Sequence, residues 1–170
     1  MATDKDVLIE RARRIAGRKD IEDQLTGETL SVVEFLLLPE RYAFEGKYIS
    51  EVLLLKEITS IPGTPPFVMG VINLRGKVVS IINLKSLFNL KEWGLTQLNK
   101  VLILKDDTME FGIVADEISE NRSIFLNTLS PPPVTLDNIG AEYISGITPD
   151  GLILLSARNL LSSKQIIINQ

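Results

Sequence analysis

The sequence predicts a mainly β protein with one leading α-helix and two similar β-units. From residue 28 onward, short segments rich in Val, Ile, Leu and Phe alternate with turn-forming residues, as in sheets built from hairpins. Similar segments recur in the same order in the two halves of the chain. Hydrophobic residues make up 45% of the 170 residues and charged residues 24%, which is ordinary for a folded globular domain.

The chain begins with a segment of helical periodicity. Apolar residues recur every three or four positions between Asp4, which suits an N-cap, and Gly17, which suits a helix stop. The other face carries arginines, and a mixed-charge stretch follows. We therefore predict a helix and linker over residues 1–27, with the basic face either in solvent or serving as a docking arm.

Ten strands are predicted after this linker. Their ranges are 30–38, 42–45, 54–60, 69–74, 77–83, 99–105, 109–115, 118–125, 143–148 and 151–155. Turn formers that preset φ, form Asx turns or tolerate positive φ separate many of them: Pro39-Glu40-Arg41, Arg75-Gly76, Asp106-Asp107-Thr108 and Pro149-Asp150-Gly151. Short helices are predicted after two of the hairpins, at Leu84 to Asn89 and at Ala157 to Ser162.

An internal sequence repeat indicates how the β domain is organised. Gly70 to Leu84 resembles Gly146 to Leu160, because each runs through Gly, a hairpin turn, an apolar strand, Asn-Leu and a short helix. Upstream, Tyr42 to Glu51 parallels Phe111 to Glu120. A duplicated β-unit explains both matches, and closing each unit into a barrel would remove the exposed edges that short strands leave.

The domain boundaries follow from this internal repeat. We predict a β domain over residues 28–163, with barrel one at about 30–90 and barrel two at about 99–162, and a C-terminal tail at 164–170.

The composition argues against an enzyme. Histidine and cysteine are both absent, which removes the commonest general base, the commonest metal ligand and the thiolate nucleophile. No catalytic residue, metal or cofactor is expected. The net charge of -4 gives no general attraction to phosphate, so no nucleic-acid partner is expected, and no apolar run is long enough for membrane insertion. A cytoplasmic protein is predicted.

Thr64 to Leu84 closely resembles the signature of the CheW family. A Thr-Pro, an apolar pair and a Gly precede Asn73-Leu74-Arg75-Gly76, and the next strand ends in Asn83-Leu84 where the family has Asp-Leu. The stretches Ile49 to Val52, Gly112 to Asp116 and Tyr143 to Ile147 are also similar to family elements. The resemblance covers about residues 29–163.

The resemblance implies two intertwined five-stranded SH3-like barrels, with short helices after the barrels, and a function without catalysis. Such a protein would be an adaptor that couples methyl-accepting chemoreceptors to the histidine kinase CheA in chemotaxis signal transduction, a two-component system. Its partners would be the CheA regulatory domain and the cytoplasmic tips of the receptors, which would recruit it to membrane-associated receptor arrays. A scaffold for a non-chemotactic pathway, such as surface motility or development, is the alternative. From other classes, a barrel pair that binds nucleic acid and an enzyme with a carboxylate-only or Lys-assisted site are the remaining interpretations.

Carried over to this chain, the receptor-binding residues would be Arg75, Asn73 and Val101. Arg75 matches the arginine of the family motif, and its planar guanidinium could hold a carboxylate or a carbonyl. An arginine at a hairpin tip in solvent is the alternative. Val101 would line a groove between the barrels or be a core valine.

The kinase-binding residues would be Ile49, Glu51 and Val52. The apolar pair would provide burial and Glu51 orientation. A strand-end glutamate beside core residues is the other interpretation.

Overall fold

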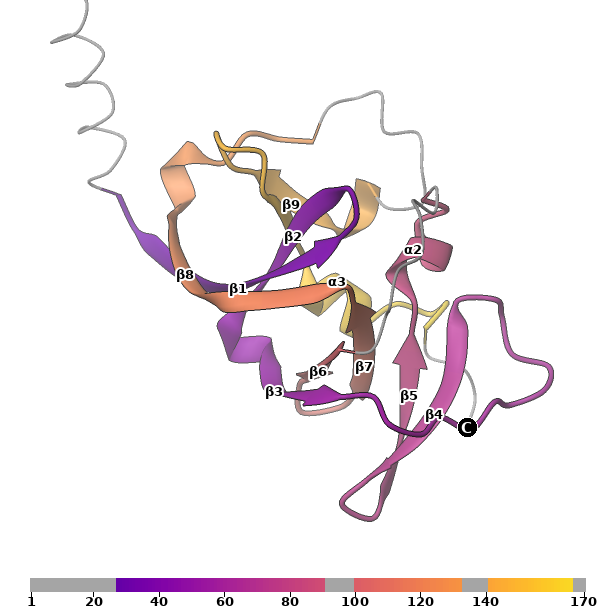
Figure 1. Ribbon diagram of the computed structural model, residues 1–170. Helices are drawn as coiled ribbons and strands as arrows, with labels where there is room; N and C mark the ends of the chain where they lie inside the picture. The colour runs from indigo at the N-terminus through magenta and orange to yellow at the C-terminus, as the bar shows by residue number, and fades with distance from the viewer. Residues whose placement is uncertain (1–26, 91–99, 133–140, 167–170) are drawn as a thin grey trace, which may run out of the picture.

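The structure, a computed structural model, describes residues 27–90, 100–132 and 141–166 (Figure 1). The predicted N-terminal helix and the end of the predicted tail lie outside these residues. Within them, no helix is long and apolar enough to cross a bilayer.

Short strands account for most of the described chain. They are β1 (Thr29–Leu37), β2 (Glu40–Glu45), β3 (Ile49–Leu54), β4 (Val68–Leu74), β5 (Lys77–Ile82), β6 (Lys100–Lys105), β7 (Glu110–Ala115), β8 (Glu117–Phe125), β9 (Ile144–Ile147) and β10 (Ile153–Leu155). The helices are α2 (Leu84–Leu87), α3 (Ala157–Leu161) and the 3₁₀ turns η1 (Gly46–Tyr48), η2 (Leu126–Thr128) and η3 (Ala141–Tyr143).

The strand predicted at 54–60 is wrong. The third strand is β3, which ends at Leu54, and of the residues beyond it only Thr59 makes a bridge. Leu55 and Ile58 still pack against a core, so the apolar pattern marks burial there without marking a continuous strand.

The strands form two five-stranded sheets, ordered β3-β6-β7-β5-β4 and β8-β1-β2-β10-β9. We call the first barrel one and the second barrel two. Each takes its central hairpin from the other half of the chain: β6 and β7 join β3 to β5, whereas β1 and β2 join β8 to β10. The sheets therefore do not follow the ranges predicted as 30–90 and 99–162. The units exchange their first hairpins, which confirms the prediction of intertwined barrels.

One isolated bridge closes each barrel. Thr59, beyond β3, exchanges two backbone hydrogen bonds of 2.9 Å with Val71 of β4, the opposite edge of the same sheet. Ser130, beyond β8, makes the same pair of bonds with Ile147 of β9. Edges that would otherwise be unpaired are thus joined, as expected for barrels.

The strand registers show that the two halves are equivalent. Phe35 pairs with Tyr42 as Leu104 pairs with Phe111, and both parallel pairs, β2 with β10 and β5 with β7, occupy matching places. The predicted sequence repeat is therefore also a repeat in the strand pairing. One detail of it is corrected, because the counterpart of Asn83 is Ser156 and not Asn159: both cap the short helix that follows.

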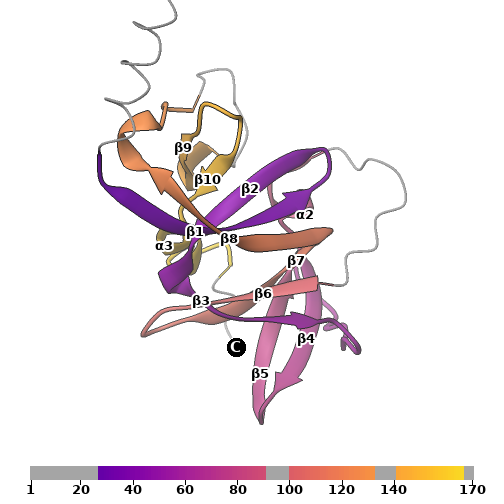
Figure 2. The ribbon, with the colours of Figure 1, turned by 60° about the vertical axis from the view of Figure 1, so that its left-hand side comes forward.

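Three clusters of apolar side chains form the core. One fills barrel one, one fills barrel two, and the largest contains residues of both barrels together with α2 and α3. Along β6, Val101 and Ile103 belong to the barrel one cluster, whereas Leu102 and Leu104 belong to the shared cluster. The strand is therefore buried on both faces, which explains its unbroken apolar run. Figure 2 shows β1 and β8 of barrel two next to β3 and β6 of barrel one.

Candidate functional site

A groove of about 430 Å³ lies between the barrels, along the edge strands β3 and β8. Its lining includes three pairs of equivalent residues from the two halves: Ile49 and Ile118, Ser50 and Ser119, and Val52 and Asn121. The inter-barrel groove thus lies where the repeats face each other. A second hollow, of about 490 Å³, adjoins it, because Lys47 and Ser50 line both.

The tip of the β4–β5 hairpin holds Arg75. Arg75 and Gly76 form a two-residue turn with φ of 52° and 85°, and Gly76 N donates to Asn73 Oδ1 at 2.9 Å. Asn73 therefore supports the turn that displays Arg75. The Arg75 side chain is 79% exposed, and this geometry confirms the predicted Arg75-Gly76 turn.

Arg75 reaches Glu51 on β3. Its Nη2 donates to Glu51 Oε2 at 2.9 Å, and the Glu51 side chain is 25% exposed. Two residues predicted to serve different partners are therefore in direct contact. Sequence spacing could not show this, because 24 positions separate them and the approach of hairpin to strand is a tertiary feature.

The other two predicted kinase-binding residues lie on the same side of β3 and both line the inter-barrel groove, because a bulge between Ile49 and Glu51 places them opposite Leu104 and Leu102. Ile49 is half-buried and packs against the shared core, whereas Val52 is 50% exposed. Leu54, two residues further along the same side of β3, is 60% exposed and was not predicted. A pair of exposed apolar side chains at a spacing of two was the pattern that could have found it.

Val101 is fully buried in the core of barrel one. It lies so close to Gly112 that a Cβ added there would be 2.8 Å from Val101 Cγ1. Its side chain offers no surface to a partner, and this position fits the core alternative.

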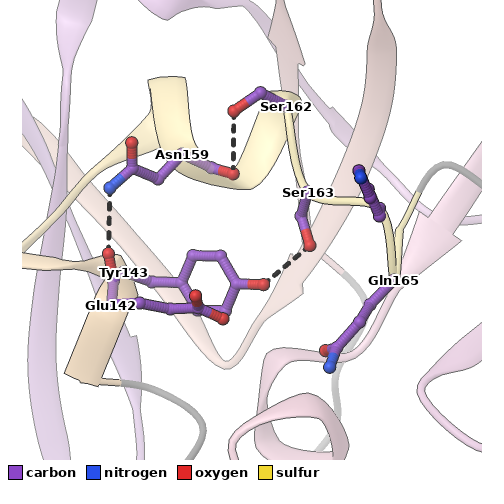
Figure 3. Close-up of a pocket in the computed structure, with 7 residues that line it drawn as sticks. Glu142, Tyr143, Asn159, Ser162, Ser163 and Gln165 are labelled. Atoms are coloured by element: carbon purple, nitrogen blue, oxygen red, sulfur yellow. Dashed lines mark hydrogen bonds between the residues drawn. The ribbon is translucent and has the colours of Figure 1, made fainter.

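A polar hollow of about 510 Å³ lies beside α3 (Figure 3). Tyr143 Oη and Ser163 Oγ are 2.7 Å apart, and Asn159 Nδ2 donates to the Glu142 carbonyl at 2.9 Å. Burial raises the pKa of Tyr143 above its usual value. These bonds hold α3 against η3 and give the hollow a structural explanation.

The two barrels, the groove between their edge strands and the exposed apolar residues beside it define a protein-interaction module. Residues 31–165 match the family model described as the CheW-like domain. The chain belongs to the CheW family, which confirms the resemblance and the predicted fold.

Relatives cover most of the chain. Proteins named chemotaxis protein CheW from Treponema pallidum and Klebsiella aerogenes are each 32% identical to it; the matches span 82% and 84% of this chain and 86% and 89% of theirs. The crystal structure of the scaffolding protein TtCheW from Thermoanaerobacter tengcongensis is similar, with a TM-score of 0.70, 30% identity, and coverage of 81% of this chain and 91% of that one.

Proposed function

We propose that this protein is a non-catalytic adaptor that couples methyl-accepting chemoreceptors to the histidine kinase CheA. The observation that carries the proposal is the Arg75–Glu51 contact, which joins the hairpin tip to strand β3 at the edge of the inter-barrel groove. Two partner surfaces placed so close together would hold two proteins side by side. The chemotaxis and scaffolding names of the relatives support the same role.

The receptor tip is assigned to the inter-barrel groove and Arg75. Arg75 is the most exposed charged group of this site. Its guanidinium can donate hydrogen bonds to a second planar group while it is bonded to Glu51. Asn73 acts through the turn geometry. Val101 acts only through core packing, since it is fully buried.

The regulatory domain of CheA is assigned to the exposed end of β3, where Val52 borders the inter-barrel groove. Val52 and the neighbouring Leu54 provide exposed apolar area, Glu51 provides orientation, and Ile49 anchors the strand in the shared core. Because Glu51 is bonded to Arg75, a partner at one surface changes the charge environment of the other. Physical contact between the two surfaces thus offers a route for coupling.

Isothermal titration with the purified CheA regulatory domain and with a receptor tip fragment tests these assignments. Arg75→Ala should weaken receptor binding about tenfold, and Glu51→Lys should weaken kinase binding by a similar factor, with unchanged circular dichroism. Lys77→Ala is a matched control, since Lys77 is 69% exposed beside the same turn. Wild-type affinity of both variants for both partners would reject the site assignment.

The swap Arg75→Glu/Glu51→Arg separates two roles of the bridge. It restores opposite charges within the protein but reverses them toward partners. If the side chains contact the partners, affinity stays low; full recovery would show that only the internal bridge matters.

The proposed role places the protein in the cytoplasm at receptor arrays. A fluorescent fusion should therefore form receptor-dependent clusters. The chemotaxis names of the relatives do not favour a separate motility or developmental pathway, and the net charge does not favour nucleic acid.

A further inference from the structure

A buried ion pair lies where the chain crosses from barrel one to barrel two. Lys85 Nζ on α2 is 3.0 Å from Asp116 Oδ2, and their side chains are only 2% and 7% exposed. Asp116 is the single residue between β7, in barrel one, and β8, in barrel two. The pair therefore holds the crossover itself.

Asp116 is fixed by two separate segments, the end of β1 and α2. Its Oδ2 accepts a hydrogen bond from Leu38 N at 2.9 Å, beyond the end of β1, and its own N donates to the Leu36 carbonyl at 2.9 Å. Lys85 brings α2, which follows β5 of barrel one. Elements of both barrels thus converge on one carboxylate.

Stability alone does not explain this pair. In the described part of the chain, Lys85 Nζ and Asp116 Oδ1 have no partner in hydrogen-bonding geometry, although both are buried. Two desolvated charges that are incompletely satisfied are often no more stable than apolar residues of the same size. A role in positioning the strands accounts better for two charges at the crossover between β7 and β8.

The Lys85–Asp116 pair lies at the start of β8, the strand that forms one wall of the inter-barrel groove. Asp116 immediately precedes β8, whose residues Ile118 and Ser119 line the inter-barrel groove. The equivalent position in the other half is Lys47, which is 65% exposed and has no such buried clamp. Among the residues that the structure describes, only the β8 wall is held by a buried charge pair.

We propose that the Lys85–Asp116 pair fixes the start of β8 against barrel one and so sets the width of the inter-barrel groove. Both are positioning residues: they are buried and act through β8. The inference concerns the groove that the proposed function assigns to the receptor, but its test needs no partner.

The test is a distance measurement across the groove. The chain contains no cysteine, so spin labels at Ser50→Cys and Ser119→Cys, one on each wall, report the groove width by double electron–electron resonance. The variant is Lys85→Met/Asp116→Asn, which removes both charges with little change of shape and keeps an acceptor for Leu38 N. The single variant Asp116→Asn would leave a buried lysine without its carboxylate and could fail to fold for that reason. The double variant is therefore the one that decides whether the pair sets the groove width.

We expect the distance distribution of the double variant to broaden about twofold or to shift, with its circular dichroism spectrum unchanged. The control Lys77→Met/Glu110→Gln removes a surface pair of 4.0 Å and should leave the distribution as in the wild type. An unchanged distribution in a folded double variant would overturn the proposal. So would a double variant that cannot fold, because the pair would then serve the whole fold. A changed groove with unchanged receptor affinity would keep this inference and count against the proposed receptor site.

Discussion

Gly70 occupies the point where barrel one closes. Its φ is 150°, and a Cβ there would overlap the Thr59 carbonyl oxygen and lie 2.9 Å from Ile58 Cγ1. Gly146 holds the matching place in barrel two, where a Cβ would be 3.3 Å from the Ser130 carbonyl oxygen. The close approach of the closing strand therefore leaves no room for a Cβ at Gly70 and only a tight space for one at Gly146.

Gly70→Ala should lower the free energy of unfolding by about 2–4 kcal/mol, because backbone must move to admit the methyl group. Urea denaturation measures this. Gly63→Ala is the control, since Gly63 has φ of 83° but no atom within 4 Å of an added Cβ, and it should cost only about 1 kcal/mol. Equal losses in the two variants would show that strain, and not the closing contact, dominates at Gly70.

Single residues of the candidate site were predictable only where a local motif marks them. Arg75 and Asn73 belong to a recognisable hairpin turn, and the structure has that turn. The contact of Arg75 with Glu51 depends on how two distant segments approach, and no local pattern encodes it. Val101 lies in an apolar run buried on both faces, so the pattern alone could not separate a core role from a groove role.

The β9–β10 turn of barrel two is tied to its neighbours by a charged network. Asp150 pairs with Arg122 of β8 at 2.9 Å and with Arg41 of β2 at 3.4 Å. Glu34 of β1 lies 3.3 Å from Arg122 and 3.2 Å from Arg41. Thr148 Oγ1 also donates to Asp150 Oδ1. The bonds from Arg122 and Thr148 hold the pKa of the Asp150 carboxyl well below its usual range.

A lowered native pKa means that the unfolded chain binds more protons at Asp150 than the folded one. The stabilisation from Asp150 is therefore complete above the usual aspartate pKa of about 4 and is lost as the pH falls below it. Wild type should have a higher Tm than Asp150→Asn at pH 6, and the difference should shrink between about pH 4 and pH 2. Asp107→Asn, in the exposed β6–β7 turn, should show no such convergence. A Tm difference independent of pH would contradict the ionic role of Asp150.

Secondary structure elements were predictable where apolar runs and turn formers coincide. The two short helices were found because leucines follow each hairpin, and both begin at a side-chain cap, Asn83 and Ser156. The third strand was misplaced toward 54–60, because Leu55 and Ile58 continue the apolar pattern beyond Leu54, whereas the backbone there pairs only at the closing bridge of Thr59. Burial and strand pairing are separate properties, and periodicity reports mainly burial.

At the scale of the molecule, the exchange of hairpins was not visible in the residues. β1 and β2 satisfy the same alternation whichever sheet they join, and their counterparts β6 and β7 are equivalent to them in register. Only the family resemblance implied intertwining. The physical outcome is that the shared core, which includes Phe35 and Leu102, lies between surfaces that each half alone could not supply.

This arrangement predicts how the chain behaves when it is divided. A fragment of residues 28–90 contains β1 to β5 but lacks the hairpin β6–β7 that separates β3 from β5 in barrel one, and a fragment of 99–163 lacks β1 and β2. Each fragment alone should give the poorly dispersed amide spectrum of an unfolded chain, and mixing the two should restore the dispersed spectrum of the whole protein. Phe35→Asp in the first fragment is the control that should prevent recovery, since Phe35 is fully buried in the shared core. A dispersed spectrum from either fragment alone would mean that one half can close a barrel from its own strands, and the exchanged hairpins would then not be required for folding.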